Sequence, residues 1–139
     1  MRRNPILVAN IFLWHHNSLL LLKRSPAHTF GNRSFWNCPG GTIEFGEDAK
    51  TAITREVMEE TGIRPRVQRL VTMWADTFPT GVQIIVYSFV GVAEKSSVKI
   101  NEESVAYKWF SPRQALALDT FPNFKEGLLQ SMSIRKGLK

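Results

Sequence analysis

Hydrophobic residues occur along most of this chain in short runs, separated by polar segments that contain glycine or proline. Runs of this length that are rich in β-branched and aromatic residues are typical of β-strands. The run at residues 82–92 is apolar at both odd and even positions, which predicts a central strand covered on both faces. The predicted strands are Pro5–Trp14, Leu19–Arg24, Phe35–Cys38, Thr42–Phe45, Val67–Thr77, Val82–Val92 and Ala106–Phe110.

Residues 48–61 instead repeat their apolar residues with the spacing of a helix. Asp48 is a favourable N-cap residue, and Gly62 is typical of the position just after a helix C-terminus. Two more helices are predicted at Pro112–Leu118 and Phe121–Ile134, the first because proline suits an initial helical turn. Many strands, one central helix and two terminal helices predict an α+β (mixed α/β) sandwich.

Composition narrows the class of protein. The 139 residues suit one domain, 1–139, and 43% hydrophobic with 22% charged residues is an ordinary soluble composition. No apolar run approaches the roughly 20 residues that span a membrane, and we interpret the N-terminal apolar stretch as a first strand, not a signal peptide. The single cysteine, Cys38, excludes an internal disulfide, predicts a small buried hydrophobe and fits a cytoplasmic location. The net charge of +6 favours an anionic partner.

Three acids stand where helix physics disfavours them. Glu56, Glu59 and Glu60 lie near the negative end of the predicted helix, where each carboxylate costs roughly 0.3–1 kcal/mol. Their spacings of three and four residues place them on one side, where two carboxylates about 4 Å apart repel by roughly 4 kcal/mol at an effective dielectric of 20. A solvated face would tolerate this arrangement, and so would a bound cation. Oxygen ligands alone select hard ions, Mg²⁺ first and Mn²⁺ next.

The spacing around these acids is that of a known motif. The segment GGTIEFGEDAKTAITREVMEETGI, residues 40–63, matches the pattern G-x5-E-x7-R-E-U-x-E-E-x-G-U, with U aliphatic, at every constrained position. This is the Nudix box, and the chain resembles Nudix hydrolases of the MutT type. The flanks are similar as well, with Lys23-Arg24 ending a strand, Trp36 before Pro39-Gly40, and the stretch 107–112 before a helix.

The resemblance implies an α/β/α sandwich around a mixed sheet, and metal-dependent attack of water on a phosphorus atom. It implies that Glu56, Glu59 and Glu60 bind the metal, with the Gly41 carbonyl as a further ligand, and that Arg55 orients them. The cofactor implied is Mg²⁺, with Mn²⁺ as a substitute.

The proton acceptor and the substrate contacts stay open between alternatives. The general base is predicted to be Glu56 or Glu59 of the motif, or else Glu102 or Glu103 in the loop before the last strand. Of the loop pair, Glu103 is the predicted catalytic residue. The predicted substrate-binding residues are Arg24, His28 and Glu47. For Glu47 the resemblance implies one of two roles. It either holds the loop that begins at Pro39-Gly40-Gly41 against the helix, or it lies in the outer shell of the metal. Trp36 and Trp74 are candidates for stacking on a base, although most such aromatics belong to a core.

The leading expectation is a nucleoside-triphosphate pyrophosphohydrolase that acts on a small-molecule nucleotide, as a monomer or homodimer. A hydrolase of ADP-ribose or nucleotide sugars is the alternative, because some of those carry a proline about sixteen residues after the box, where this chain has Pro79. A nucleotide-sensing module without turnover is the non-enzymatic alternative, although its box is usually degenerate and this one is intact. No dedicated nucleic-acid-binding domain and no membrane association are expected.

Overall fold

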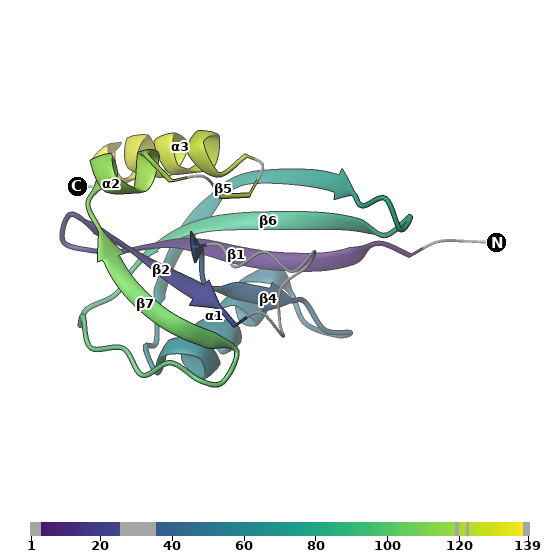
Figure 1. Ribbon diagram of the computed structural model, residues 1–139, viewed down its shortest axis with the longest axis horizontal. Helices are drawn as coiled ribbons and strands as arrows, with labels where there is room; N and C mark the ends of the chain where they lie inside the picture. Colours follow the sequence, from purple (N-terminus) through teal and green to yellow (C-terminus); the bar gives the residue numbers. More distant parts are fainter. Residues whose placement is uncertain (1–3, 26–35, 119, 122, 138–139) are drawn as a thin grey trace.

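The computed structural model describes residues 4–25, 36–118, 120–121 and 123–137. It contains strands and helices in the predicted proportions (Figure 1). The elements are β1 Ile6–His15, β2 Ser18–Arg24, β3 Trp36–Asn37, β4 Gly40–Thr42, α1 Ala49–Thr61, β5 Arg66–Thr77, β6 Gln83–Val92, β7 Ser104–Phe110, α2 Pro112–Leu116 and α3 Phe124–Gly137.

The strands form one mixed sheet with the order β3-β2-β1-β6-β5, to which β4 adds beside β1 and β7 beside β2. Strands β1 and β6 run parallel, whereas the other pairs are antiparallel. Strand β6 lies between β1 and β5, so the prediction of a central strand at this position is confirmed.

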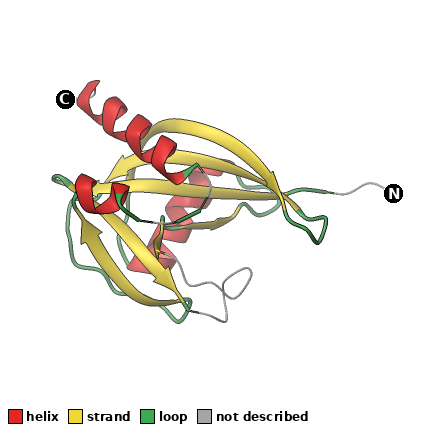
Figure 2. Ribbon diagram, turned by 45° about the horizontal axis from the view of Figure 1, so that its top comes forward, coloured by secondary structure: helices red, strands yellow, loops and turns green. Residues whose placement is uncertain are grey.

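Helices cover both faces of the sheet (Figures 1 and 2). Alternate residues of β1 explain the two layers, because successive side chains of a strand point to opposite faces. Ile11 packs in the same core cluster as Ile53 of α1, and Phe12 packs in the other cluster with Phe124 of α3. The fold is therefore the α/β/α sandwich expected from the motif. None of the described helices is long and apolar enough to cross a membrane.

Several predicted boundaries were wrong. The strand expected at Thr42–Phe45 is β4, which begins at Gly40 and ends at Thr42, and the fully exposed Phe45 lies outside it. The prediction treated the glycines as a break, whereas a Cβ at Gly40 would lie 2.2 Å from the Ala9 carbonyl oxygen, so glycine is what permits this pairing. The last helix runs from Phe124 to Gly137 instead of from Phe121 to Ile134, and it follows Asn123 in a left-handed conformation (φ 69°). Helix α2 ends at Leu116 instead of Leu118, and β7 begins at Ser104 instead of Ala106.

Helix α1 has the predicted ends. The Asp48 carboxylate accepts a 2.7 Å hydrogen bond from the Thr51 amide, and Gly62 has a left-handed φ of 73° with its amide donating to the Met58 carbonyl. Both ends rest on local chemistry, which is why the sequence located them. Cys38 is buried as predicted, and burial raises the pKa of its thiol.

Candidate active site at the C-terminal half of helix α1

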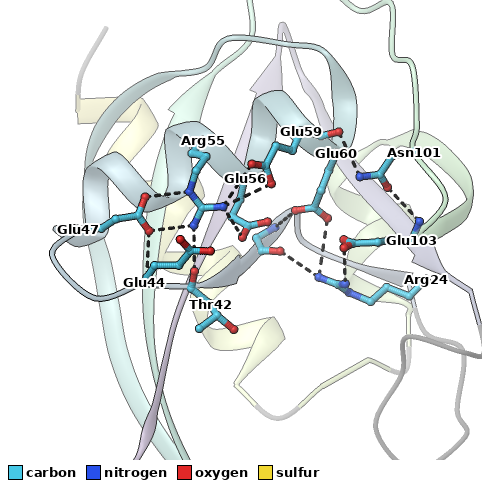
Figure 3. A network of polar contacts seen from close by, with 11 residues as sticks. Arg24, Thr42, Glu44, Glu47, Arg55, Glu56, Glu59, Glu60, Asn101 and Glu103 are labelled. Carbon is cyan, nitrogen blue, oxygen red and sulfur yellow. Dashed lines mark hydrogen bonds and ion pairs between the residues drawn. The ribbon is translucent and has the colours of Figure 1, made fainter.

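Arg55 lies at the centre of a polar network that connects helix α1 to the preceding segment, residues 42–47 (Figure 3). Its Nε and Nη2 atoms donate to the two oxygens of Glu47, both at 2.8 Å, in a bidentate pair. Nη2 also donates to the Thr42 carbonyl at 3.1 Å. The guanidinium lowers the pKa of Glu47 from 4.5 to about 2. Arg55 and Glu47 therefore connect the loop of residues 42–47 to the helix.

The remaining Arg55 nitrogen faces two box carboxylates. Nη1 donates to Glu56 at 3.0 Å and lies 3.4 Å from the nearer oxygen of Glu59. The Glu56 carboxylate also lies against Gly41, where an added Cβ would be 2.5 Å from its Cδ. Burial raises the pKa of Glu56, although Arg55 opposes this. Glycine at position 41 thus leaves the room that Glu56 occupies.

Glu60 differs from the other two acids because it is 1% exposed. One of its oxygens accepts a 2.9 Å hydrogen bond from the Gly40 amide, and the other lies 3.7 Å from Nη2 of Arg24. Burial raises the pKa of Glu60 to about 8, a larger effect than the opposing ones of Arg24 and Gly40. This buried acid joins α1 to β4 and to the end of β2.

Arg24 brings a third part of the chain to the same place. It donates a 2.9 Å hydrogen bond to the Gly40 carbonyl, and its Nη1 lies 3.8 Å from Glu103 in the loop before β7. Glu103 is half-buried, whereas its neighbour Glu102 is exposed. The structure thus brings Arg24 and Glu103 together with the box acids.

Other predicted residues lie elsewhere. His28 is outside the described residues. Trp36 packs edge-on against Phe110 with ring centroids 5.1 Å apart, and Trp74 stacks on Phe121 at 6.0 Å, so both aromatics belong to side-chain packing.

Asn101, which donates to the Glu59 carbonyl at 3.2 Å, was not predicted from the sequence. The Gly40 amide was not predicted as the partner of Glu60 either. A sequence signal existed for the burial of Glu60, because Ile53, Val57 and Glu60 repeat with helical spacing and share the inner face.

The donor set fits a hard divalent cation in its chemistry. Three carboxylates lie on consecutive turns of one helix, and the space beside Gly41 holds one of them close to the backbone. Within the described part of the chain, however, no three His, Cys, Asp or Glu side chains converge as a ready metal site. Glu56 and Glu59 instead share the Arg55 guanidinium, and Glu60 turns toward Gly40.

Changing Arg55 to Lys is expected to raise the pKa of Glu47 from about 2 toward 4.5, because an ammonium cannot make the bidentate pair. The present pair stabilises the fold above pH 4.5, and that contribution is lost as the pH falls through about 2. The variant should also have a lower free energy of unfolding at pH 7, because it loses one of the two hydrogen bonds to Glu47. NMR titration of Glu47 and urea unfolding measure both effects. Arg66→Lys, at an exposed arginine, is the control, and an unchanged Glu47 pKa in Arg55→Lys would contradict the assignment.

Comparison with known proteins identifies the family. The model of the NUDIX domain family matches residues 4–132, so the chain belongs to the Nudix family. Nudix hydrolases generally use divalent metal ions.

Two relatives and one solved structure illustrate the range of similarity. The chain is 32% identical over 111 residues to a MutT-like protein of Streptomyces ambofaciens, covering 78% of this chain and 65% of that protein. It is 34% identical over 83 residues to an ADP-ribose pyrophosphatase of Methanocaldococcus jannaschii, covering 56% of this chain and 46% of that protein. The crystal structure of a MutT protein from Methanosarcina mazei Go1 superposes with a TM-score of 0.82 at 26% identity, covering 98% and 99% of the two chains. The chain thus spans less than two thirds of the length of both relatives.

Proposed function

We propose that this protein hydrolyses a phosphoanhydride bond in a nucleoside diphosphate linked to a second group, and that the substrate is a nucleoside triphosphate. The observation that carries the proposal is the meeting of three parts of the chain at one end of α1. The box acids come from the helix, Arg24 from the end of β2 and Glu103 from the loop before β7. Acids for a metal, a cation for phosphate and a further carboxylate are the groups that this hydrolysis needs.

The proposed metal ligands are Glu56, Glu59, Glu60 and the Gly41 carbonyl, with Mg²⁺ as the cofactor and Mn²⁺ as a substitute. When bound, such a metal would neutralise phosphate charge and lower the pKa of the attacking water. Nη1 of Arg55 contacts Glu56 and Glu59, while Nε and Nη2 donate to Glu47. This arrangement lets one side chain keep the acids oriented and the loop in place.

The roles toward substrate follow from position. Arg24 supplies positive charge for a phosphate beside Glu60, and Glu103 supplies a carboxylate at the same place. We assign the proton acceptor to Glu103 or to one of Glu56 and Glu59. His28 and Glu47 complete the proposed substrate-binding set.

The relatives support two substrate classes. A nucleoside triphosphatase of Escherichia coli, 30% identical to this chain over 95 residues, favours the nucleoside triphosphate. The ADP-ribose pyrophosphatase favours ADP-ribose as the second candidate. The intact box favours turnover over nucleotide sensing alone.

Turnover of a substrate panel tests the proposal. We expect Mg²⁺-dependent hydrolysis of at least one compound among nucleoside and deoxynucleoside triphosphates, ADP-ribose, nucleotide sugars, dinucleoside polyphosphates and NADH. Release of pyrophosphate and a nucleoside monophosphate from a triphosphate would identify the leading class. Hydrolysis of ADP-ribose alone would select the second candidate. Tight nucleotide binding without hydrolysis, in either Mg²⁺ or Mn²⁺, would replace the enzyme with the sensing module.

A further inference from the structure

The loop that joins β6 to β7 folds back onto the C-terminal end of α1. The Lys99 amide donates to the Thr61 carbonyl at 2.9 Å, and the Asn101 side-chain nitrogen donates to the Glu59 carbonyl at 3.2 Å. Carbonyls in the last turn of a helix have no partner within the helix. The loop therefore supplies the missing donors to the turn that carries Glu59 and Glu60.

The other end of the Asn101 side chain shapes the loop itself. Its Oδ1 accepts a 3.0 Å hydrogen bond from the Glu103 amide, which is an Asx-turn, and the Ser104 amide donates to the Asn101 carbonyl at 3.3 Å. The Glu103 carbonyl in turn accepts from the Ser25 amide at 2.9 Å, next to Arg24. Glu103 is thus held between the end of α1 and the end of β2 (Figure 3).

From these contacts we infer that Asn101 is a positioning residue for Glu103. A single amide group uses its donor on the helix that carries the box acids and its acceptor on the backbone of Glu103. Only an amide offers both functions at this length, because Asp lacks the donor and Ala lacks both. The inference rests on the proposed function, since it gives Glu103 a place in catalysis.

Hydrogen exchange in the metal-free protein tests the geometry without any turnover. Asn101→Ala is expected to speed exchange of the Glu103 amide at least ~10-fold, while amides in the middle of α1 stay protected. Asn101→Asp keeps the acceptor and is expected to retain most of this protection. Ser97→Ala, at an exposed site in the same loop, is the control. Equal exchange of the Glu103 amide in the Ala variant and the unchanged protein would overturn the inference.

A double-mutant cycle with Glu103→Gln tests the catalytic consequence. Asn101→Ala should lower kcat about 10- to 100-fold with KM within about threefold, a part of the ~10²–10⁴ that a base contributes. In the Glu103→Gln background the same change should have almost no further effect, because the group it positions is gone. Asn101→Asp should recover part of the kcat.

The outcomes separate the two proposals. The catalytic role of Asn101 would be ruled out if Asn101→Ala lowered kcat equally in both backgrounds, or if Glu103→Gln kept full activity. Asn101 would then only cap the helix, and the proposed hydrolase function would be unaffected. No turnover of any compound by the unchanged protein would remove the proposed function and, with it, the catalytic role given to Glu103. The exchange experiment would then still decide whether Asn101 holds the Glu103 backbone.

Discussion

Changing Glu59 to Gln is expected to lower Mg²⁺-dependent turnover at least ~100-fold while the protein stays folded, a loss of about 2.7 kcal/mol of transition-state stabilisation. The substitution keeps the size of the side chain and removes the negative charge that the proposed metal site needs. Folding should hardly change, because the Glu59 side chain is 55% exposed. Among the described residues, its hydrogen bonds and ion pair are with Arg55 alone, at 3.4–3.5 Å. Exposed pairs of this kind contribute roughly 0–1 kcal/mol.

Three measurements check this expectation together. Steady-state kinetics give the turnover, urea unfolding gives the stability, and titration with Mn²⁺ gives the metal affinity, which should fall in Glu59→Gln. Glu94→Gln, at a surface acid 82% exposed and remote in sequence from the box, is the matched control and should behave like the unchanged protein. Turnover near the unchanged level in both Glu59→Gln and Glu60→Gln would remove these acids from the metal site.

Local chemistry explains which parts of the structure the sequence predicted. The ends of α1 depend on Asp48 and Gly62, each of which acts within four residues, and both were located correctly. The apolar run of β6 depends on burial of both faces, which its own composition encodes. The parallel pairing of β1 with β6, across more than seventy residues, has no such local signature.

The sequence predicted which residues belong to the candidate site, but it did not predict how their side chains are arranged. Glu56, Glu59 and Glu60 were treated as three equivalent acids on one helix face. In the structure the first two share Arg55, and the third is buried against Gly40. The fine difference follows from the 3.6-residue helical period, which turns Glu60 toward the sheet and leaves Glu59 toward solvent. Asn101 escaped prediction because it meets Glu59 across 42 residues.

Substitution of Glu60 is expected to change the stability and the activity of the protein in opposite directions. Its pKa is about 8 in the folded protein against 4.5 in the unfolded chain, so the folded state binds a proton more tightly. The free energy of unfolding should therefore fall as the pH rises from 4.5 through about 8. Glu60→Gln removes this titration and keeps an oxygen that can accept from the Gly40 amide. In metal-free buffer the variant should become more stable than the unchanged protein at pH 8–9, by roughly 2–4 kcal/mol.

Urea unfolding in EDTA at several pH values between 5 and 9 measures this difference. The stability of Glu60→Gln relative to the unchanged protein should rise with pH, whereas that of Glu94→Gln should stay level. A difference that does not depend on pH would mean that Arg24 and the Gly40 amide keep Glu60 ionised at neutral pH. Turnover of the same variant completes the test, with an expected loss of at least ~100-fold. A protein that is more stable and less active would mean that the buried acid is retained for metal chemistry at the expense of the fold.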